Sequence, residues 1–409
     1  MEGKRFIHEL RLRNLLSYGP EAEAIKLEPL NVLIGPNASG KSNLLEAISL
    51  LQAAPRDLGA PIREGGGVSE WLWKGADEGM AEIVALVTNP TCPVGLRHSL
   101  SFEQVGQRLA IGEEYIAEDG WTPDRGDLLY YRWVRALGVF TTPARRETTG
   151  GPTDTEMRDW WQSGVMTPVV TPEQSVLAEL RDARYYPEIT YLARQYEQIH
   201  LYREWNLGRS AVLRRPQPSD LADDFLEEDA VNLGMVLNDL EHRGDPKRMI
   251  LECLERFYGA TERMDLTTKI QGGTVQIFLR EPGLKHPIPA TRLSDGTLRF
   301  LCLLAVLCHP EPPPLICIEE PELGLHPDVM PMLAELLQAA AARTQLIVTT
   351  HSDRLLSSLM EVPEAVVVCE RDPERGTTLT RLDPEPLKEW LERYTLGTLW
   401  AMGEIGGNP

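Results

Sequence analysis

The chain has 409 residues, of which 42% are hydrophobic and 25% charged, a balance that fits one large globular domain with an insertion or two to three smaller domains. With 41 basic and 61 acidic residues its net charge is −20, so its overall field repels nucleic acids and acidic membranes, and DNA could bind only through a local basic patch. Six cysteines without a C-x-x-C pair, a start without a signal-peptide core and no apolar run of bilayer length predict a cytoplasmic protein with neither a zinc site nor a membrane span.

The N-terminal part shows the apolar patterns of strands around a single helix. The expected strands cover residues 6–12, 25–27 and 30–34, and a helix that starts at Ser42 ends before Pro55. Three further segments alternate at period two and predict an antiparallel sheet beside the first strands: residues 82–88, 96–103 and 108–116.

Residues 35–42 read GPNASGKS and match G-x-x-x-x-G-K-[ST], the phosphate-binding loop of nucleoside triphosphatases. Gly35 and Gly40 allow backbone N–H groups to face phosphate oxygens. Lys41 supplies a positive charge for the β- and γ-phosphates, and the Ser42 hydroxyl is a ligand for Mg²⁺. A chance glycine turn is the alternative, which the apolar strand before the loop and the helical spacing after it disfavour. We therefore predict that ATP and Mg²⁺ bind through Gly35, Pro36, Asn37, Ala38, Ser39, Gly40, Lys41, Ser42 and Asn43.

Residues 121–272 differ in pattern and are predicted to form a mainly helical insertion. Helical apolar spacing covers residues 176–192, 232–240 and 248–258. Charge divides within this region: residues 181–215 hold seven arginines against four acidic residues, whereas residues 216–265 hold five basic and thirteen acidic residues. The basic segment could contact DNA phosphates or pair with the acidic segment, and we favour the pairing.

From residue 273 onward, strands alternate with helices, as in a largely parallel α/β core. The expected strands are residues 274–280, 315–319, 346–350 and 365–369. Helices are expected to begin near Gly296 and Asp328. Residues 387–400 predict a last helix that packs on the body through Trp390, Leu391 and Tyr394.

Polar side chains follow two of these apolar strands. Carboxyl ends of parallel strands meet at one sheet edge, where ligands bind. There Glu319 would hold Mg²⁺ through water, and Glu320 would polarise the water that attacks the γ-phosphate. His351 would contact the γ-phosphate. The alternatives are a solvated strand end and an ordinary hydrogen-bonded histidine, which the phosphate loop disfavours.

Four motifs in this order carry a family resemblance: GPNASGKS, LSDGT (residues 293–297), ICIEEPELGLHP and TTHS. They resemble the Walker A, signature, Walker B with D-loop, and switch-histidine motifs of ABC-type ATPases. LRNLLSYG, DAVNLGMVLNDL and YTLGTLWAMGEIGG narrow the resemblance to the AAA_15/AAA_21 group of predicted ATPases, which is related to RecF, SMC and OLD-type proteins.

The resemblance implies a P-loop ABC-ATPase head of the α/β class, with a mainly parallel sheet, an antiparallel β-subdomain and a largely helical insertion. The expected division is residues 1–120 and 273–409 for the two halves of the head and 121–272 for the insertion. It also implies a head-to-tail homodimer in which Ser294 and Gly296 of one protomer reach the γ-phosphate held by the other.

Several residues depart from the family pattern. Ala38 replaces a loop glycine, and Asp295 replaces a signature glycine and adds negative charge near ATP. Glu319 stands where most ABC ATPases have aspartate. For a Q-loop glutamine, Gln104 and Gln107 are candidates, although we favour ordinary strand positions for both. Separately, Asn14 and Tyr18 could flank the adenine or ribose or form a structural turn.

Three functions compete for such an ATPase. The first is an ATP-dependent switch that controls a separate effector, such as a nuclease or toxin, in a defence or genome-maintenance system. The second is a RecF/SMC-like repair ATPase that binds DNA directly. A transporter subunit is disfavoured, because about 250 residues separate Lys41 from Ser294 and EEPELGLHP differs from transporter motifs. The net charge favours the first reading, with weak DNA binding at most.

Overall fold

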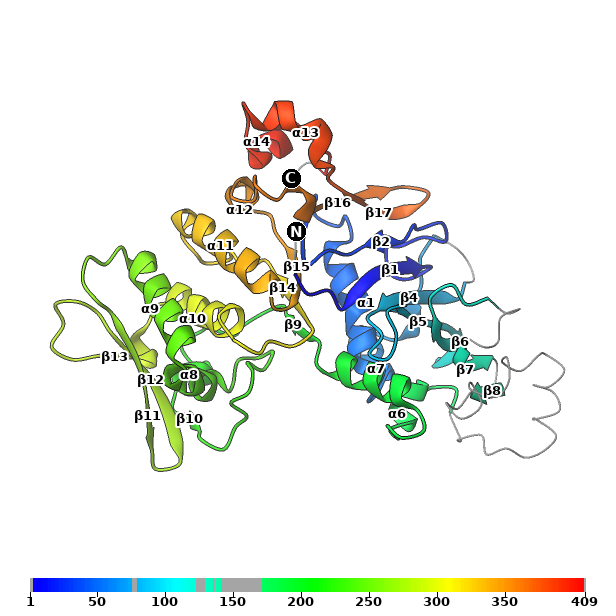
Figure 1. Ribbon diagram of the computed structural model, residues 1–409, viewed down its shortest axis with the longest axis horizontal. Helices are drawn as coiled ribbons and strands as arrows, with labels where there is room; N and C mark the ends of the chain where they lie inside the picture. The colour runs from blue at the N-terminus through cyan, green and yellow to red at the C-terminus, as the bar shows by residue number, and fades with distance from the viewer. Residues whose placement is uncertain (1–2, 76–78, 123–128, 135–136, 141–170, 408–409) are drawn as a thin grey trace.

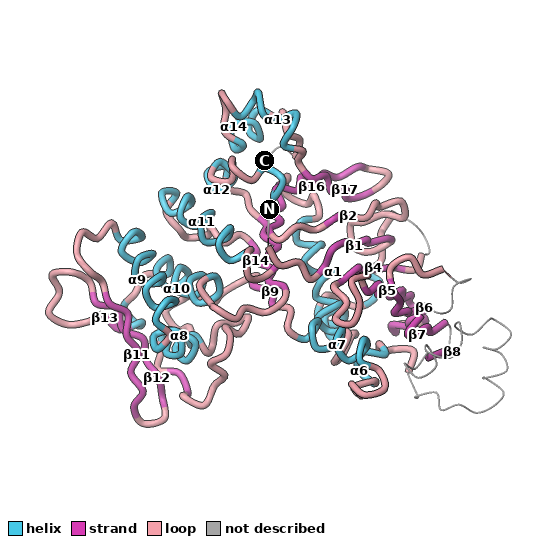
Figure 2. The backbone as a smooth tube through the Cα atoms, in the orientation of Figure 1, coloured by secondary structure: helices cyan, strands magenta, loops and turns pink. Residues whose placement is uncertain are grey.

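The computed structural model describes residues 3–75, 79–122, 129–134, 137–140 and 171–407. Its strands form three sheets, which Figures 1 and 2 show as a central sheet with an antiparallel sheet on one side and a small third sheet on the other.

The central sheet has six strands in the order β17-β16-β3-β15-β14-β9. Every pair is parallel except β16 with β17. The bounds are β3 Leu30–Ile34, β9 His200–Tyr202, β14 Leu315–Glu319, β15 Gln345–Thr349, β16 Val366–Asp372 and β17 Gly376–Arg381. All residues of β3 and β15 are buried, as expected for strands covered on both faces. The predicted parallel α/β core is confirmed.

Alternate side chains of the central sheet enter two different cores. Ile316 and Ile318 pack with α10 (Asp295–Leu307) and α11 (Met330–Ala341), which follows the 3-10 turn η4 (Pro327–Val329). Leu315 and Cys317 pack with α1 (Lys41–Ala53) and the antiparallel sheet. The period-two alternation of a strand therefore binds two layers to one sheet.

The antiparallel sheet has seven strands in the order β2-β1-β4-β5-β6-β7-β8. They are β1 Ile7–Arg13, β2 Ile25–Lys26, β4 Ala81–Val87, β5 Leu96–Val105, β6 Arg108–Glu118, β7 Leu129–Val134 and β8 Leu137–Phe140. Two short helices, α2 (Gly59–Glu64) and α3 (Val68–Trp71), follow α1. The sheet predicted from residues 82–116 is confirmed.

Residues 171–292 divide between the head and the third sheet. The first part is α6 (Val176–Glu179) and α7 (Pro187–Glu197), which share the core of α1, and then β9, which joins the central sheet. The helix predicted over residues 176–192 is therefore two helices, because the backbone leaves the helical region at Leu180 and Pro187 opens the next helix.

The second part packs two helices on the small sheet. It contains η2 (Val212–Arg214), β10 (Gln217–Pro218), α8 (Leu233–His242), α9 (Gly244–Tyr258), β11 (Asp265–Gln271), β12 (Thr274–Arg280), β13 (Ile288–Pro289) and η3 (Ala290–Arg292). The expected domain boundary at residue 272 lies in the β11–β12 hairpin, so this small sheet extends across it. The division into three parts stays a prediction.

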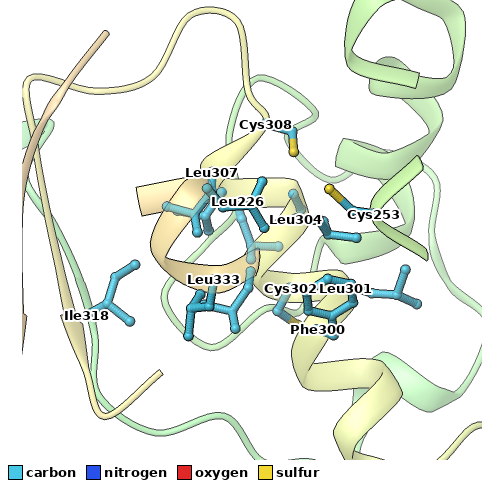
Figure 3. Close-up of a cluster of buried hydrophobic side chains, with 14 of the residues drawn as sticks. Leu226, Cys253, Phe300, Leu301, Cys302, Leu304, Leu307, Cys308, Ile318 and Leu333 are labelled. Atoms are coloured by element: carbon cyan, nitrogen blue, oxygen red, sulfur yellow. The ribbon is translucent and has the colours of Figure 1, made fainter. Parts of the chain in front are cut away.

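Buried cysteines fill the core between this region and the head. Figure 3 shows Cys253, Cys302 and Cys308 among leucine side chains and Phe300. All six cysteines are free, and all except Cys92 are buried. Burial raises the pKa of the Cys302 and Cys308 thiols to about 12, which keeps them protonated and unreactive.

The C-terminal region ends in three short helices, α12 (Asp353–Ser357), α13 (Pro384–Leu391) and α14 (Leu396–Met402), with η5 (Pro363–Ala365) after α12. The single helix predicted over residues 387–400 is wrong, because the Thr395 side chain caps a new helix. Trp390 and Tyr394 are 42% and 38% exposed, contrary to expectation, and Trp400 is the buried aromatic residue. Among the described residues no helix has the length and apolar character needed to cross a bilayer.

Candidate nucleotide-binding site

The predicted phosphate loop joins the end of β3 to the start of α1. Gly35 and Gly40 have φ angles of +148° and +106°, which L-residues rarely adopt. A Cβ atom on Gly35 would lie 2.2 Å from the carbonyl oxygen of Cys369. Ala38 also has a positive φ of 63°, which costs roughly 1–2 kcal/mol for a residue other than glycine. No side chain caps the start of α1, which leaves its first N–H groups available to an anion.

Hydrogen bonds that involve three side chains, those of Ser17, Tyr18 and Thr377, stabilise the phosphate loop. Tyr18 is 2% exposed, and its hydroxyl donates to the Gly40 carbonyl at 3.1 Å. Burial raises its pKa well above the usual value, so the phenol stays protonated. The Thr377 hydroxyl donates to the Ser39 carbonyl at 2.8 Å and contacts the Ser17 hydroxyl at 2.7 Å. Sequence reasoning missed Ser17 and Thr377, because 360 positions separate them.

Asn14 and Tyr18 belong to a structural turn, which was one of the two alternatives proposed for them. Asn14 has a φ of +49°, and its amide donates to the Met80 carbonyl at 3.3 Å. Leu15 and Tyr18 exchange backbone hydrogen bonds in the turn that follows. Both side chains are thus engaged within the protein.

Lys41 and Ser42 begin α1 and have different surroundings. Lys41 is 6% exposed, and its Nζ donates to the carbonyl oxygens of Gly35 and Pro36 at 2.7 and 3.0 Å. Burial lowers the pKa of Lys41, an effect that nearby acidic groups oppose. The exposed Ser42 hydroxyl donates to the Glu319 carboxylate. The P-loop and the end of the Walker B strand are therefore in direct contact.

Glu320 follows β14 in a strained backbone conformation. Its φ is +45°, and its N–H donates to the Thr349 carbonyl at 3.1 Å, which ties it to the end of β15. Positive φ values at residues other than glycine cluster at functional sites. His351 Nε2 lies 3.7 Å from Glu320 Oε1, so the predicted base and the predicted switch histidine are neighbours.

Glu322 connects the D-loop to the segment that carries His351. Its Oε1 accepts hydrogen bonds from the Thr350 hydroxyl at 2.6 Å and from the His351 N–H at 2.8 Å. Burial raises the pKa of Glu322, although these hydrogen bonds oppose the shift. Sequence reasoning did not single out this residue; its signal was its place in EEPELGLHP.

The signature residues lie at the exposed start of α10. Ser294 caps the helix, because its hydroxyl accepts a hydrogen bond from the Thr297 N–H at 3.0 Å. Ser294 and Asp295 are exposed, and a Cβ on Gly296 would lie 2.8 Å from the Gly324 carbonyl of the D-loop. No hydrogen bond or ion pair among the described residues joins Ser294 or Gly296 to the phosphate loop of the same chain.

The edge strand β9 brings a further segment to the same sheet edge. Arg203 follows β9 and lies 3.5 Å from Glu46 of α1, and Glu204 comes next. Both line a cleft of about 1040 Å³ that also contains Glu319 and Glu320. Gln104, by contrast, lies near the end of β5 in the antiparallel sheet and donates to the Gly106 carbonyl, which agrees with an ordinary strand position. The strand position favoured for Gln107 is wrong, because Gln107 lies in the turn between β5 and β6. Strand β9 was not predicted from the sequence, because three residues are too few to show an alternating pattern.

The donor set at the sheet edge fits Mg²⁺. Among the described residues there is no cluster of three or more His, Cys, Asp and Glu side chains that could hold a metal. The Ser42 hydroxyl and the Glu319 carboxylate offer hard oxygen ligands, as Mg²⁺ prefers when phosphate and water supply the others.

The fold is similar to that of solved SMC head domains. One is an Smc head bound to the C-terminal winged-helix domain of ScpA, with a TM-score of 0.55 and 15% identity over 93% of this chain and 99% of that chain. Another is an Smc head with an extended coiled coil bound to the C-terminal domain of ScpA, derived from Pyrococcus furiosus, with a TM-score of 0.53 and 12% identity over 95% and 98% of the chains. The protein therefore has a P-loop ABC-ATPase fold, as predicted.

Sequence comparison identifies the family. The family model AAA_21, described as an AAA domain, putative AbiEii toxin, Type IV TA system, matches residues 30–85 and 170–357, which is more than half of the chain. The chain belongs to this family. No curated protein matches the sequence.

Proposed function

We propose that the protein binds Mg-ATP at the carboxyl edge of the central sheet and hydrolyses it. The observation that carries this proposal is the contact between Ser42 and Glu319 beside the uncapped start of α1. The backbone N–H groups of residues 35–43, except Pro36, which has none, hold the phosphates together with the Lys41 amine. Ser42 and Glu319 hold Mg²⁺, the latter through water.

Hydrolysis needs a base and a group that responds to the γ-phosphate. Glu320 is the proposed base, since it follows the Walker B strand and is partly exposed. His351 lies beside Glu320 and would donate a hydrogen bond to the γ-phosphate. Loss of that phosphate would therefore change the position of His351, and with it the hydrogen bond to Glu322 and the end of β15.

We further infer that ATP joins two copies of the chain head to tail. Ser294 and Gly296 are proposed to bind the γ-phosphate, but among the described residues no hydrogen bond or ion pair joins either of them to the phosphate loop of its own chain. Their position at the exposed start of α10 supports contact with a nucleotide held by a second copy. ATP would then act as the switch for homodimer formation.

The switch is proposed to control a separate effector, such as a nuclease or toxin, in a cytoplasmic defence or genome-maintenance system. The family description, which refers to a putative toxin of a toxin–antitoxin system, supports a place in a defence system of this kind. The two SMC heads bind another protein, ScpA, which is a precedent for partner binding by this fold.

Direct DNA binding is the second candidate function, and one observation favours it. The predicted pairing of residues 181–215 with residues 216–265 is wrong: Arg181, Arg203 and Arg214 pair with Glu197, Glu46 and Asp295. Arg194, Arg209 and Arg215 are exposed and form no ion pair with a described residue. These three arginines could contact phosphates, although the net charge of −20 opposes tight binding.

The decisive test combines turnover with mass measurement. Purified protein should hydrolyse ATP only with Mg²⁺, and light scattering should show a dimer when ATP is added to the Glu320→Gln variant. Affinity purification with co-encoded proteins, with and without ATP, then tests for the effector. A protein that binds ATP but stays monomeric in every nucleotide state would refute the switch.

A further inference from the structure

A buried arginine from η2 is bonded directly to the signature loop. Arg214 is 5% exposed, and its Nε donates to the Leu207 carbonyl at 2.8 Å. Its Nη1 donates to the Leu293 carbonyl at 2.6 Å, and its Nη2 donates to the Asp295 carboxylate. One guanidinium therefore holds the residue on each side of Ser294.

Helix α9 holds the same loop from another direction. The Tyr258 hydroxyl lies 2.9 Å from the Thr297 hydroxyl, which also contacts Ser294 Oγ at 2.8 Å. The Phe257 and Phe300 rings stack with centroids 4.5 Å apart. The position of the signature loop thus depends on residues of the segment between β9 and β11.

The contact with Arg214 also compensates the negative charge of Asp295. The Asp295 side chain is 70% exposed next to Ser294, where a bare carboxylate would repel the phosphates of a bound nucleotide. The Arg214 side chain is 6% exposed, and its guanidinium supplies the compensating charge. The replacement of a signature glycine by Asp295 is therefore matched by a buried cation.

We propose that Arg214 is a positioning residue of the ATPase, which cancels the charge of Asp295 and fixes the Leu293 carbonyl so that Ser294 and Gly296 face the γ-phosphate held by a second copy of this chain. This inference rests on the proposed ATP-dependent dimer. It makes the signature loop responsive to any event that moves the segment carrying Arg214.

A purely structural clamp is the competing explanation, and a double-mutant cycle separates the two. The variants are Arg214→Gln, Asp295→Asn and the double variant, each in the Glu320→Gln background. Arg256→Gln is the matched control, because Arg256 also joins a helix of this segment to the head, through two bonds to Glu335 at 2.7 and 3.1 Å. In the part of the chain that the structure describes, Arg256 forms no hydrogen bond or ion pair with residues 293–297.

The readouts are the dimer Kd by sedimentation in saturating Mg-ATP and the affinity of the dilute monomer for a fluorescent ATP analogue. Arg214→Gln should weaken the dimer by about tenfold or more, with unchanged monomer affinity. Asp295→Asn should dimerise at least as well as the parent, and the double variant should recover most of the loss. Higher salt should reduce the defect of Arg214→Gln, since it screens the exposed carboxylate.

Two results would overturn the inference while leaving the dimer intact: an Arg214→Gln variant that behaves like Arg256→Gln, or a double variant no better than Arg214→Gln. If the parent does not dimerise with ATP, the proposed function fails and this inference fails with it. If Arg214→Gln does not fold, Arg214→Lys takes its place, because lysine keeps the charge but loses the planar group that bonds the Leu293 carbonyl. The dimer Kd of Arg214→Lys should then lie between that of the parent and the value expected when the charge of Asp295 is not compensated. A dimer Kd equal to that of the Arg256→Gln control would contradict the proposal.

Discussion

The Glu322 carboxylate accepts a hydrogen bond from the backbone N–H of His351 at 2.8 Å, and the same oxygen accepts one from the Thr350 hydroxyl at 2.6 Å. The D-loop and the switch-histidine segment are thereby held by one side chain. A displacement of either segment must break or move these bonds, so we expect Glu322 to matter for both stability and turnover.

The first prediction concerns Glu322 and pH. Because burial raises the pKa of this carboxyl, the folded protein holds its proton more tightly than the unfolded chain does. At a pH above the pKa of Glu322 in the folded protein, its charged carboxylate therefore lowers the free energy of unfolding. At a pH below the pKa of this group in the unfolded chain, the carboxyl is protonated in both states and the loss disappears. Glu322→Gln keeps an acceptor for both bonds without the charge, so its thermal stability relative to wild type should improve from pH 5 to pH 8.

Glu322→Ala is the matched truncation. It leaves the Thr350 hydroxyl and the His351 N–H without their acceptor and should cost about 1.5–3 kcal/mol in chemical denaturation, with reduced ATP turnover. A Gln variant whose stability falls relative to wild type as pH rises would contradict the sign of this pKa shift.

Lys41→Ala should abolish ATP binding without unfolding the protein. Loss of a charge that bonds phosphate typically costs about 2–5 kcal/mol, or thirtyfold or more in affinity. Calorimetric titration with Mg-ATP measures the loss, and the melting temperature reports folding. Lys74→Ala is a suitable control, since the Lys74 side chain is 61% exposed and, among the described residues, bonds only to Glu70 and to the Ser69 carbonyl on the surface. Unchanged ATP affinity in Lys41→Ala would show that the loop has only a structural role.

Glu320→Gln should retain ATP binding and lose hydrolysis. The amide keeps the shape of the side chain but cannot act as a general base, whose loss commonly lowers the rate by about 10²–10⁴-fold. Single-turnover assays should therefore show an ATP-bound state that persists. Normal turnover in this variant would exclude Glu320 as the base.

Mixed dimers test whether each site uses both copies. Ser294→Arg should bind ATP but not hydrolyse it, because the bulky cation damages the site of the partner. Mixing it with Lys41→Ala protomers creates dimers with one damaged and one intact site, so part of the activity should return. Heterodimers that form without any turnover would contradict independent composite sites.

DNA binding by the isolated protein should be weak and should collapse with salt. Any contact is electrostatic and works against the net charge. Mobility shifts at 50 and 200 mM salt measure this, and replacing Arg194, Arg209 and Arg215 by Gln should remove the residual binding. Tight binding to DNA ends that resists salt would instead favour the repair function.

The parts of the fold that sequence reasoning predicted carry strong local signals. β3, β14 and β15 are apolar runs because both faces of the central sheet are covered, and each leads into a polar motif. Strand β9 escaped prediction because its three residues are defined only by pairing with β14.

Contacts between residues far apart in the sequence were the other feature that could not be predicted. Apolar spacing predicted that Trp390, Leu391 and Tyr394 pack on the body. Leu391 does pack against the C-terminal core, but Trp390 and Tyr394 are exposed, because spacing cannot say whether another element covers a residue. Likewise the count of charges in residues 181–215 did not reveal that Arg214 would meet Asp295, 81 positions away. Charge composition predicts a field, whereas an ion pair requires the fold.

The strand order of the central sheet has a consequence for biosynthesis. Asn31 in β3 donates to the Leu346 carbonyl of β15, 315 positions later, and the other neighbour of β3 is β16, later still. At ordinary translation rates β3 is made about 15–60 s before β15 leaves the ribosome. During that interval an apolar strand has neither of its neighbours, and such non-local pairing folds slowly. The nascent chain should therefore depend on chaperones until its last quarter is synthesised.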